Sequence, residues 1–242
     1  MKKLFIRRLL SLIFSIGILV FNFSPLFSKS VADSDWLMNG WKAYNAKDYV
    51  QAMKSFRKAD LPENPFAEYY IGVLYASGLG VPQNYHEAMN WYLKSAEKGY
   101  PIAESKIGSL YADGLGVPQN YQQAMKWWKK AAGRGNPPDG KPRIGIVYQT
   151  GTGDPEAESK IGFSYENGLG ISQDYQEALK WWKKAAAKGD TYAETNIGSL
   201  YADGHGVPQD YQEAMKWYQK ALKHGFAPAQ KSINDLKQKM VK

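Results

Sequence analysis

The sequence contains no cysteine. This absence excludes disulfide bonds, lipid attachment through cysteine and thiol chemistry, so packing alone must stabilise the fold. Histidine is also scarce, because only His86, His205 and His224 occur in the chain. None of the three has a second histidine or a cysteine at the spacing that metal ligands need. We therefore expect neither a metal ion nor a cofactor.

A long hydrophobic run occurs only near the N-terminus. Basic residues precede an apolar stretch from Leu9 to Phe23, and small residues follow it. This order predicts a secretory signal peptide over residues 1–32, cleaved after Ala32. The alternative is an uncleaved membrane anchor, since the run can be extended to Phe27 and then nearly reaches spanning length. We expect a periplasmic or secreted protein, which touches the membrane only if the signal is retained.

The charge of the chain depends on that segment. The formal net charge is +8, and residues 1–32 hold five of the 31 basic residues and none of the acidic ones. Removing the segment lowers the net charge by five, to +3. So small a positive charge removes the main argument for a nucleic-acid partner.

The remainder of the chain repeats itself with a period of 36 residues. Alanines mark equivalent positions of the repeat: Ala67, Ala103, Ala157, Ala193 and Ala229. Periods of this size are typical of solenoids, in which each unit is a pair of elements that buries its apolar face only against its neighbours.

The first half of each unit predicts a helix. Ala67, Ile71 and Tyr75 follow one another at four-residue spacing and therefore fall on one helical face. Gly72 beside them allows another helix to come close. Gly78 and Gly80 should both end the helix, since glycine enters left-handed conformations at little cost.

The second half of each unit predicts another helix, which begins with a capping box. In such a box the N-cap side chain accepts from the third residue's backbone N–H, and the third side chain reaches back to the N-cap N–H. Two aromatic residues follow on the inner stripe. The N-caps are Asn84, Asn120, Asp174 and Asp210, and the tandem aromatics are Trp91/Tyr92, Trp127/Trp128, Trp181/Trp182 and Trp217/Tyr218.

These motifs resemble a known family. The run I-G-x2-Y-x2-G-x-G-V-P-x-[DN]-Y-x-x-A-x-x-W-[YW] between Ala67 and Pro228 is similar to the Sel-1-like repeat, a relative of the tetratricopeptide repeat. The resemblance implies an all-α fold, a right-handed α/α solenoid of helix hairpins. The expected units are a divergent tetratricopeptide-like unit at 33–66, two Sel-1-like repeats at 67–138, two more at 157–228, and a capping helix at 229–242.

The period is broken once. Ala103 and Ala157 are 54 residues apart, which is one period of 36 plus 18. The surplus at 139–156 keeps the signature of a first helix and lacks a second one, so we interpret it as a half repeat. It predicts a bend or hinge between two packed blocks, and a surface loop without a role is an equal alternative.

No motif carries a convincing catalytic signal. The segment from Gly135 to Lys141 resembles a phosphate-binding loop, but Pro142 replaces the hydroxyl that would hold magnesium. Carboxylates recur once in each unit and therefore indicate a structural role rather than one tuned acid–base pair. They are Glu68, Glu104, Glu158 and Glu194. We expect no enzymatic activity.

The candidate binding residues follow from the resemblance. In the tetratricopeptide architecture the first helix of each unit lines a concave groove, which implies the same here. The glycine that follows the repeat isoleucine is the framework glycine, which is Gly72, Gly108, Gly162 or Gly198, with Gly40 in the divergent first unit. The groove positions lie three before, one after and five after it in the four repeats: Tyr69, Val73, Ser77, Ser105, Ser109, Asp113, Ser159, Phe163, Asn167, Thr195, Ser199 and Asp203. They vary between units more than the framework does, although exposed residues without a role would also vary. Charge counts predict an acidic inner face and a basic outer face.

The resulting hypothesis is an exported bacterial adaptor that binds another protein or a peptide through this concave face. Bacterial proteins with similar repeats serve as exported adaptors, which is an implication of the resemblance. One alternative is a cell-envelope enzyme or a regulator that acts on cell-wall components. Another is self-assembly through the ends of the solenoid.

Overall fold

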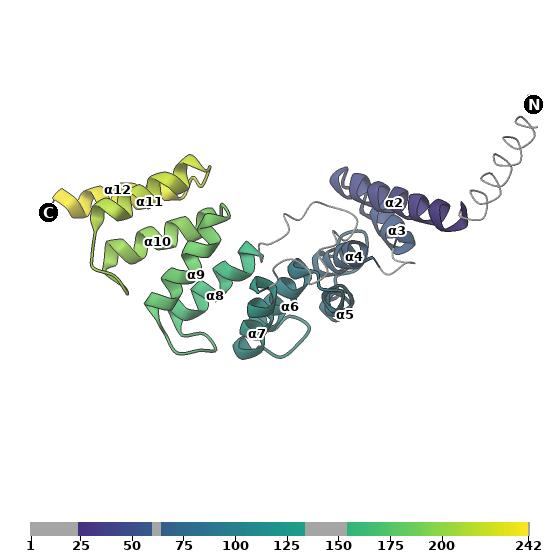
Figure 1. The fold of residues 1–242 in the computed structure, drawn as a ribbon, viewed down its shortest axis with the longest axis horizontal. Coiled ribbons are helices and arrows are strands. Elements are labelled where there is room, and N and C mark those ends of the chain that lie inside the picture. Colours follow the sequence, from purple (N-terminus) through teal and green to yellow (C-terminus); the bar gives the residue numbers. More distant parts are fainter. Residues whose placement is uncertain (1–23, 60–63, 134–153, 242) are drawn as a thin grey trace, which may run out of the picture.

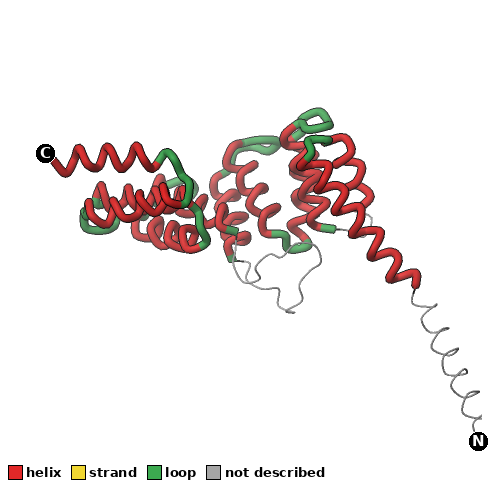
Figure 2. The backbone as a smooth tube through the Cα atoms, turned by 90° about the horizontal axis from the view of Figure 1, so that it is seen from above, coloured by secondary structure: helices red, strands yellow, loops and turns green. Residues whose placement is uncertain are grey.

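The computed structural model describes residues 24–59, 64–133 and 154–241, and every regular element in these ranges is a helix. Consecutive helices stack side by side along an arc (Figure 1). A view from above shows helices joined by short loops over the same ranges (Figure 2). The predicted all-α solenoid is confirmed.

The helices form hairpins, whose first members we call A helices and whose second members we call B helices. The A helices are α2 (Ser24–Asn45), α4 (Pro65–Ser77), α6 (Pro101–Asp113), α8 (Pro155–Asn167) and α10 (Thr191–Asp203). The B helices are α3 (Tyr49–Ala59), α5 (Tyr85–Glu97), α7 (Tyr121–Ala132), α9 (Tyr175–Ala187) and α11 (Tyr211–Lys223), and α12 (Ala229–Val241) follows them. Each B helix packs on its own A helix and on the next helix along the chain.

The B helices of the four repeats begin at the predicted N-caps. Asn84 Oδ1 accepts from the Glu87 N–H at 3.1 Å, which is the first half of the capping box. The second half of the prediction is wrong, because the Asn84 N–H donates to the Tyr75 carbonyl of the A helix at 2.9 Å. This bond joins the two helices of one hairpin. The equivalent bonds run from Asn120 to Tyr111, from Asp174 to Tyr165 and from Asp210 to Tyr201.

The two aromatic residues of each tandem pair have different roles. The second one is buried against the framework glycine, and a Cβ atom added to Gly108 would lie 2.5 Å from Trp128 Cδ1. The first one is half-buried, and Trp127, for example, packs against a cluster that contains residues of its own A helix and of the preceding units. Lys130 Nζ covers that ring at 4.6 Å from its centroid. Only the second aromatic residue therefore belongs to the predicted inner stripe.

The paired glycines also differ, although both have positive φ. Gly114 (φ 68°) is the C-cap of α6, as predicted. Gly116 (φ 70°) does not end the helix, and a Cβ atom there would lie 2.8 Å from the Tyr85 carbonyl carbon of the preceding unit. The second glycine is thus a contact between units, where any side chain would collide with backbone.

The core continues across the break in the period. Residues 139–153 of the predicted half repeat lie outside the described residues, so the hinge stays a prediction. On either side of the break, α7 and α8 pack directly, and the Asp154 N–H donates to the Ala131 carbonyl at 3.3 Å. One hydrophobic cluster contains residues of both helices: Ala124, Met125, Trp128, Ala131, Ala157 and Ile161.

The two ends of the chain differ in how far the structure describes them. The predicted signal peptide is described only from Ser24, in the first turns of α2. Within the described ranges, no helix combines the length and the apolar character that crossing a bilayer requires. At the other end α12 packs on α11, where Ile233 and Leu236 share a cluster with Tyr218.

Candidate functional site

One face of each A helix is exposed or partly exposed at nearly every position. Its residues lie six and two positions before the framework glycine and one and five positions after it. These offsets have the i, i+4, i+7, i+11 spacing of one helical stripe. We call it the A stripe. It comprises Met38, Trp41 and Asn45; Phe66, Tyr70, Val73 and Ser77; Ile102, Lys106, Ser109 and Asp113; Glu156, Lys160, Phe163 and Asn167; Tyr192, Asn196, Ser199 and Asp203. All but Phe66 are at least partly exposed.

The A stripe gathers the exposed apolar side chains. Six large apolar residues are exposed in the described part of the chain, and four of them lie on the stripe. These are Met38 at 52%, Trp41 at 42%, Phe163 at 39% and Tyr192 at 47% exposed. Singly exposed apolar residues are ordinary, but a concentration on one face indicates a surface that meets a partner.

The arc of the solenoid gives this face its setting. In Figure 1, α4 and α6 lie toward the inner side of the bend, and α5 and α7 lie toward its outer side. Two thirds of the predicted groove residues are on the stripe: Val73, Ser77, Ser109, Asp113, Phe163, Asn167, Ser199 and Asp203. Asp203 is already paired, since Lys239 Nζ of α12 lies 3.0 Å from its carboxylate.

The predicted position three before the glycine lies off the stripe, at the junction between units. Ser105 and Ser159 are buried, and the Ser159 hydroxyl donates to Asp190, the N-cap of α10, at 2.6 Å. The Tyr69 ring lies 5.4 Å from that of Tyr100, the N-cap of α6. Thr195, the fourth such residue, is half-buried. We leave these four residues out of the candidate surface.

The predicted groove spacing explains this difference. The second and third predicted positions lie four and eight residues after the first. In a helix with 3.6 residues per turn they are therefore rotated by about 40° and about 80° from it, so the three positions do not stay on one face. The i, i+4, i+7, i+11 spacing keeps to one face. It adds residues that the groove prediction missed: Tyr70, Ile102, Lys106, Glu156, Lys160, Tyr192 and Asn196.

The charge predicted for the inner face is wrong. Four of the acidic residues that the charge count placed on the inner face are buried, and each is paired with a cation of its own unit. Glu104, for example, is fully buried, and Lys130 Nζ lies 3.2 Å from its carboxylate. The other pairs are Glu68 with Lys98, Glu158 with Lys188, and Glu194 with Lys220 and His224. These carboxylates are therefore part of the framework, as their recurrence suggested.

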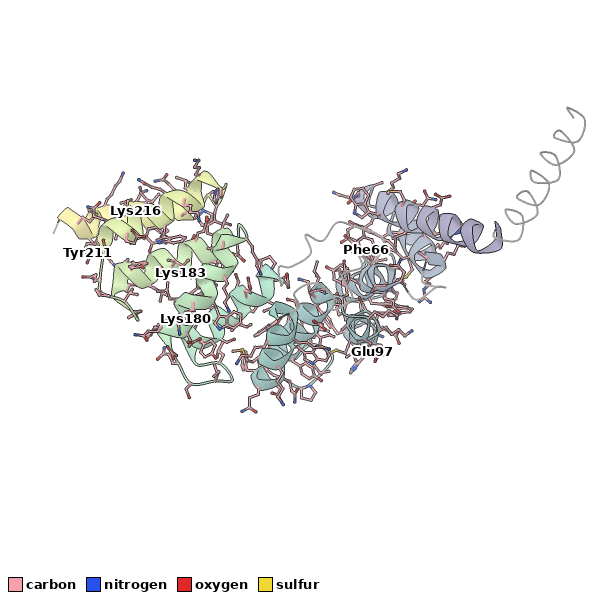
Figure 3. The ribbon with its side chains drawn as sticks, viewed as in Figure 1. Phe66, Glu97, Lys180, Lys183, Tyr211 and Lys216 are labelled. Carbon is pink, nitrogen blue, oxygen red and sulfur yellow. The ribbon has the colours of Figure 1, made fainter. Side chains whose placement is uncertain are left out.

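The outer face carries exposed lysines on the B helices. Figure 3 shows Lys180 and Lys183 on α9 and Lys216 on α11. Lys180 and Lys216 each pair with a glutamate one turn earlier on the same helix, and these bonds raise the pKa of both ammonium groups. Such exposed pairs contribute little to stability and shield part of the positive charge.

In the part of the chain that the structure describes, three carboxyl groups have a raised pKa, and each has a structural partner. Burial raises the pKa of Asp154, which caps α8. Burial also raises the pKa of Glu158, and the ion pair with Lys188 offsets part of that rise. Burial also raises the pKa of Glu166, whose carboxylate accepts from Trp182 Nε1 at 3.1 Å. Among the described residues, no group of three or more His, Cys, Asp or Glu side chains could hold a metal ion.

Comparison with known proteins agrees with this architecture. The family model described as Sel1 repeat matches residues 65–100, 101–136, 155–190 and 191–226, two residues ahead of the predicted repeat boundaries. No curated protein matches the sequence.

Several solved structures are similar to this one. A Sel1 repeat protein from Oxalobacter formigenes is 35% identical, with a TM-score of 0.66 over 82% of this chain and 74% of that one. The protein c5321, a protective antigen of uropathogenic Escherichia coli with an SLR fold, is 30% identical, with a TM-score of 0.72 over 88% of this chain. This chain spans 42% of the c5321 chain.

The same fold recurs at lower identity. A putative sel1 repeat protein from Klebsiella pneumoniae is 16% identical and has a TM-score of 0.52, over 82% of this chain and 89% of that one. Proteins with Sel1 repeats are generally scaffolds for protein–protein interactions and are typically not catalytic. Because the repeat model matches more than half of the chain and a solved Sel1 repeat protein is 35% identical over most of both chains, this chain belongs to the Sel1 repeat family.

Proposed function

We propose that the protein is an exported adaptor that binds another protein or an extended peptide along the A stripe. The observation that carries the proposal is the clustering of Met38, Trp41, Phe163 and Tyr192 on this one face. Leaving these side chains in water gains nothing for the fold, whereas covering them with a partner removes apolar surface from water.

The pattern of recurrence supports the same assignment. The framework glycine and the aromatic ring against it recur in every hairpin, because a Cβ atom at the glycine would collide with that ring. The stripe residue two positions before the glycine is instead Met38, Tyr70, Lys106, Lys160 or Asn196. Stacked repeats extend a binding surface by adding neighbour contacts, and the variable positions on that surface give it specificity.

Export is the second part of the proposal. Cleavage after Ala32 would leave Asp33 to Asn45 of α2, which is 13 residues, the length of α4, α6, α8 and α10. Cleavage at the predicted position would therefore leave an A helix of ordinary length. Mass spectrometry of the protein from periplasmic and culture fractions should find Asp33 at the N-terminus. A full-length chain in the cytoplasmic fraction would contradict export.

Binding can be tested with two matched pairs of substitutions. The stripe variant carries Trp41→Ser and Phe163→Ser, and the control carries Val50→Ser and Met240→Ser, which remove exposed apolar side chains away from the stripe. All four side chains are exposed, so both variants should keep the helical circular dichroism and the unfolding midpoint of the wild type.

The readout is quantitative capture from envelope and secreted fractions, compared protein by protein across the wild type and both variants. We expect specific partners to be lost from the stripe variant and retained by the control. Equal capture by all three proteins would remove the A stripe as the binding face.

A further inference from the structure

Two consecutive A helices are joined by an ion pair on the A stripe. Lys106 of α6 and Glu156 of α8 approach to 2.8 Å, and both carboxylate oxygens accept from the ammonium group. Lys106 lies two positions before its framework glycine, and Glu156 lies six positions before the next one. The repeat thus brings these two positions of neighbouring units together.

The next junction keeps the lysine and lacks the glutamate. Lys160 of α8 is equivalent to Lys106, and Tyr192 of α10 is equivalent to Glu156. Lys160 is exposed, and its ammonium group makes no ion pair or hydrogen bond within the described residues. Glu156 lies one turn before it on the same helix, but both of its oxygens face Lys106. Among the described residues, the second junction therefore has the cation but not the carboxylate that pairs with it at the preceding junction.

Exposed aromatic side chains flank this cation on both helices. Phe163 lies one turn after Lys160 on α8 and is 39% exposed. Tyr192 is 47% exposed, and its ring packs edge-on against the buried Trp182, with centroids 5.7 Å apart. That contact holds the tyrosine in place before any partner arrives, which lowers the entropy lost on binding.

We propose that Lys160, Phe163 and Tyr192, together the Lys160 site, bind an acidic residue of a partner peptide together with an aromatic or aliphatic residue beside it. The peptide carboxylate takes the place that Glu156 has on Lys106, and the neighbouring apolar side chain covers the two rings. A charge-assisted hydrogen bond to the ammonium selects the acid, and apolar burial supplies the remaining affinity. This inference rests on the proposed function and names the chemistry of its ligand.

The first experiment identifies the peptides that the protein prefers. A phage-displayed library of random linear peptides is selected on the full-length chain, and enriched sequences are synthesised with the acidic residue and with its amide counterpart. We expect enriched peptides to carry Asp or Glu next to an apolar residue. Fluorescence anisotropy should show that the amide peptide binds about two- to fivefold more weakly, the range for losing one ion pair at an exposed site.

The repeat itself supplies the decisive variant. Tyr192→Glu reproduces the pair of the preceding junction and so provides Lys160 with an internal carboxylate. The variant should lose the preference for acidic over amide peptides while keeping the wild-type circular dichroism, and its urea midpoint should fall only by the loss of the ring contact with Trp182. The matched control, Tyr192→Phe, keeps the ring and should keep the preference. Lys160→Glu should shift selection toward peptides with Lys or Arg.

The outcomes separate this inference from the proposed function. If enriched peptides contain no acidic residue, or if Tyr192→Glu binds acidic peptides as the wild type does, the Lys160 site is refuted. In that case, loss of peptide binding in the Trp41→Ser, Phe163→Ser variant would still support the A stripe as the binding face. If the wild type enriches no peptide and the stripe variant captures the same proteins as its control, both proposals fail.

Discussion

Replacing Gly116 by alanine should destabilise the solenoid more than the same change at Gly114, two residues earlier in the same turn. The two glycines have nearly the same conformation, with φ of 70° and 68°. A left-handed conformation costs about 1–2 kcal/mol for alanine, and this cost is common to both variants.

The neighbours of the added methyl group differ. At Gly114 it would lie 3.2 Å from the Gln119 Cβ, which can shift slightly. At Gly116 it would lie 2.8 Å from the Tyr85 carbonyl carbon, in the backbone of the preceding unit. Forcing extra volume against packed neighbours typically costs about 1–3 kcal/mol more. We therefore expect about 1–2 kcal/mol for Gly114→Ala and about 2–5 kcal/mol for Gly116→Ala.

Urea unfolding followed by circular dichroism measures both values, with Gly189→Ala as a control. Gly189 has φ of 87° and nothing within 4 Å of an added Cβ, so it reports the backbone cost alone. Because Gly116 holds two units together, its variant should also unfold less cooperatively, with a lower m-value. Equal destabilisation by Gly114→Ala and Gly116→Ala would refute the assignment of the second glycine to the contact between units.

Three further predictions concern single side chains. Glu87→Ala should change the unfolding free energy by less than about 0.5 kcal/mol. The Asn84 N–H, which was predicted to donate to the Glu87 side chain, already donates to the Tyr75 carbonyl. A larger loss in urea titrations would support the full capping box. Trp182→Ala should cost about 3–5 kcal/mol and Trp181→Ala clearly less, since Trp182 is fully buried and Trp181 is not; similar urea midpoints would disprove their different roles. Burial raises the pKa of Glu166 above 4.5, so the folded protein favours the protonated side chain. Compared with Glu166→Gln, the wild type should therefore be most stable below pH 4.5, and this advantage should be lost as pH rises through the folded-state pKa of Glu166. Urea midpoints of both proteins across this range measure the difference, and a constant one would contradict the shift.

Much of the architecture could be predicted from the repeated sequence. Glycine beside a stripe of alanine and isoleucine, a capping residue and two aromatics recur at one period, so local propensity and burial indicate the same helices in every unit. The predicted N-caps are correct because a side-chain oxygen bonds only to N–H groups two or three residues away. Such interactions are local and need no knowledge of the fold.

The candidate surface was less predictable, because it depends on contacts between units. Ser105 and Ser159 look like ordinary exposed polar residues until the next A helix covers them. The buried glutamates suggest an acidic face in the sequence, but in the structure lysines at the ends of the B helices neutralise them. Neither neighbour is close in the sequence.

The chain itself therefore determined the helices, their caps and their period, because each depends on residues within a turn or two. The packing of units against one another decided which aromatic ring is buried, which glycine touches the preceding unit, and which lysine is left without a carboxylate among the described residues. These outcomes depend on how far each unit is rotated and displaced from the last, and that geometry arises only when the hairpins share one apolar core.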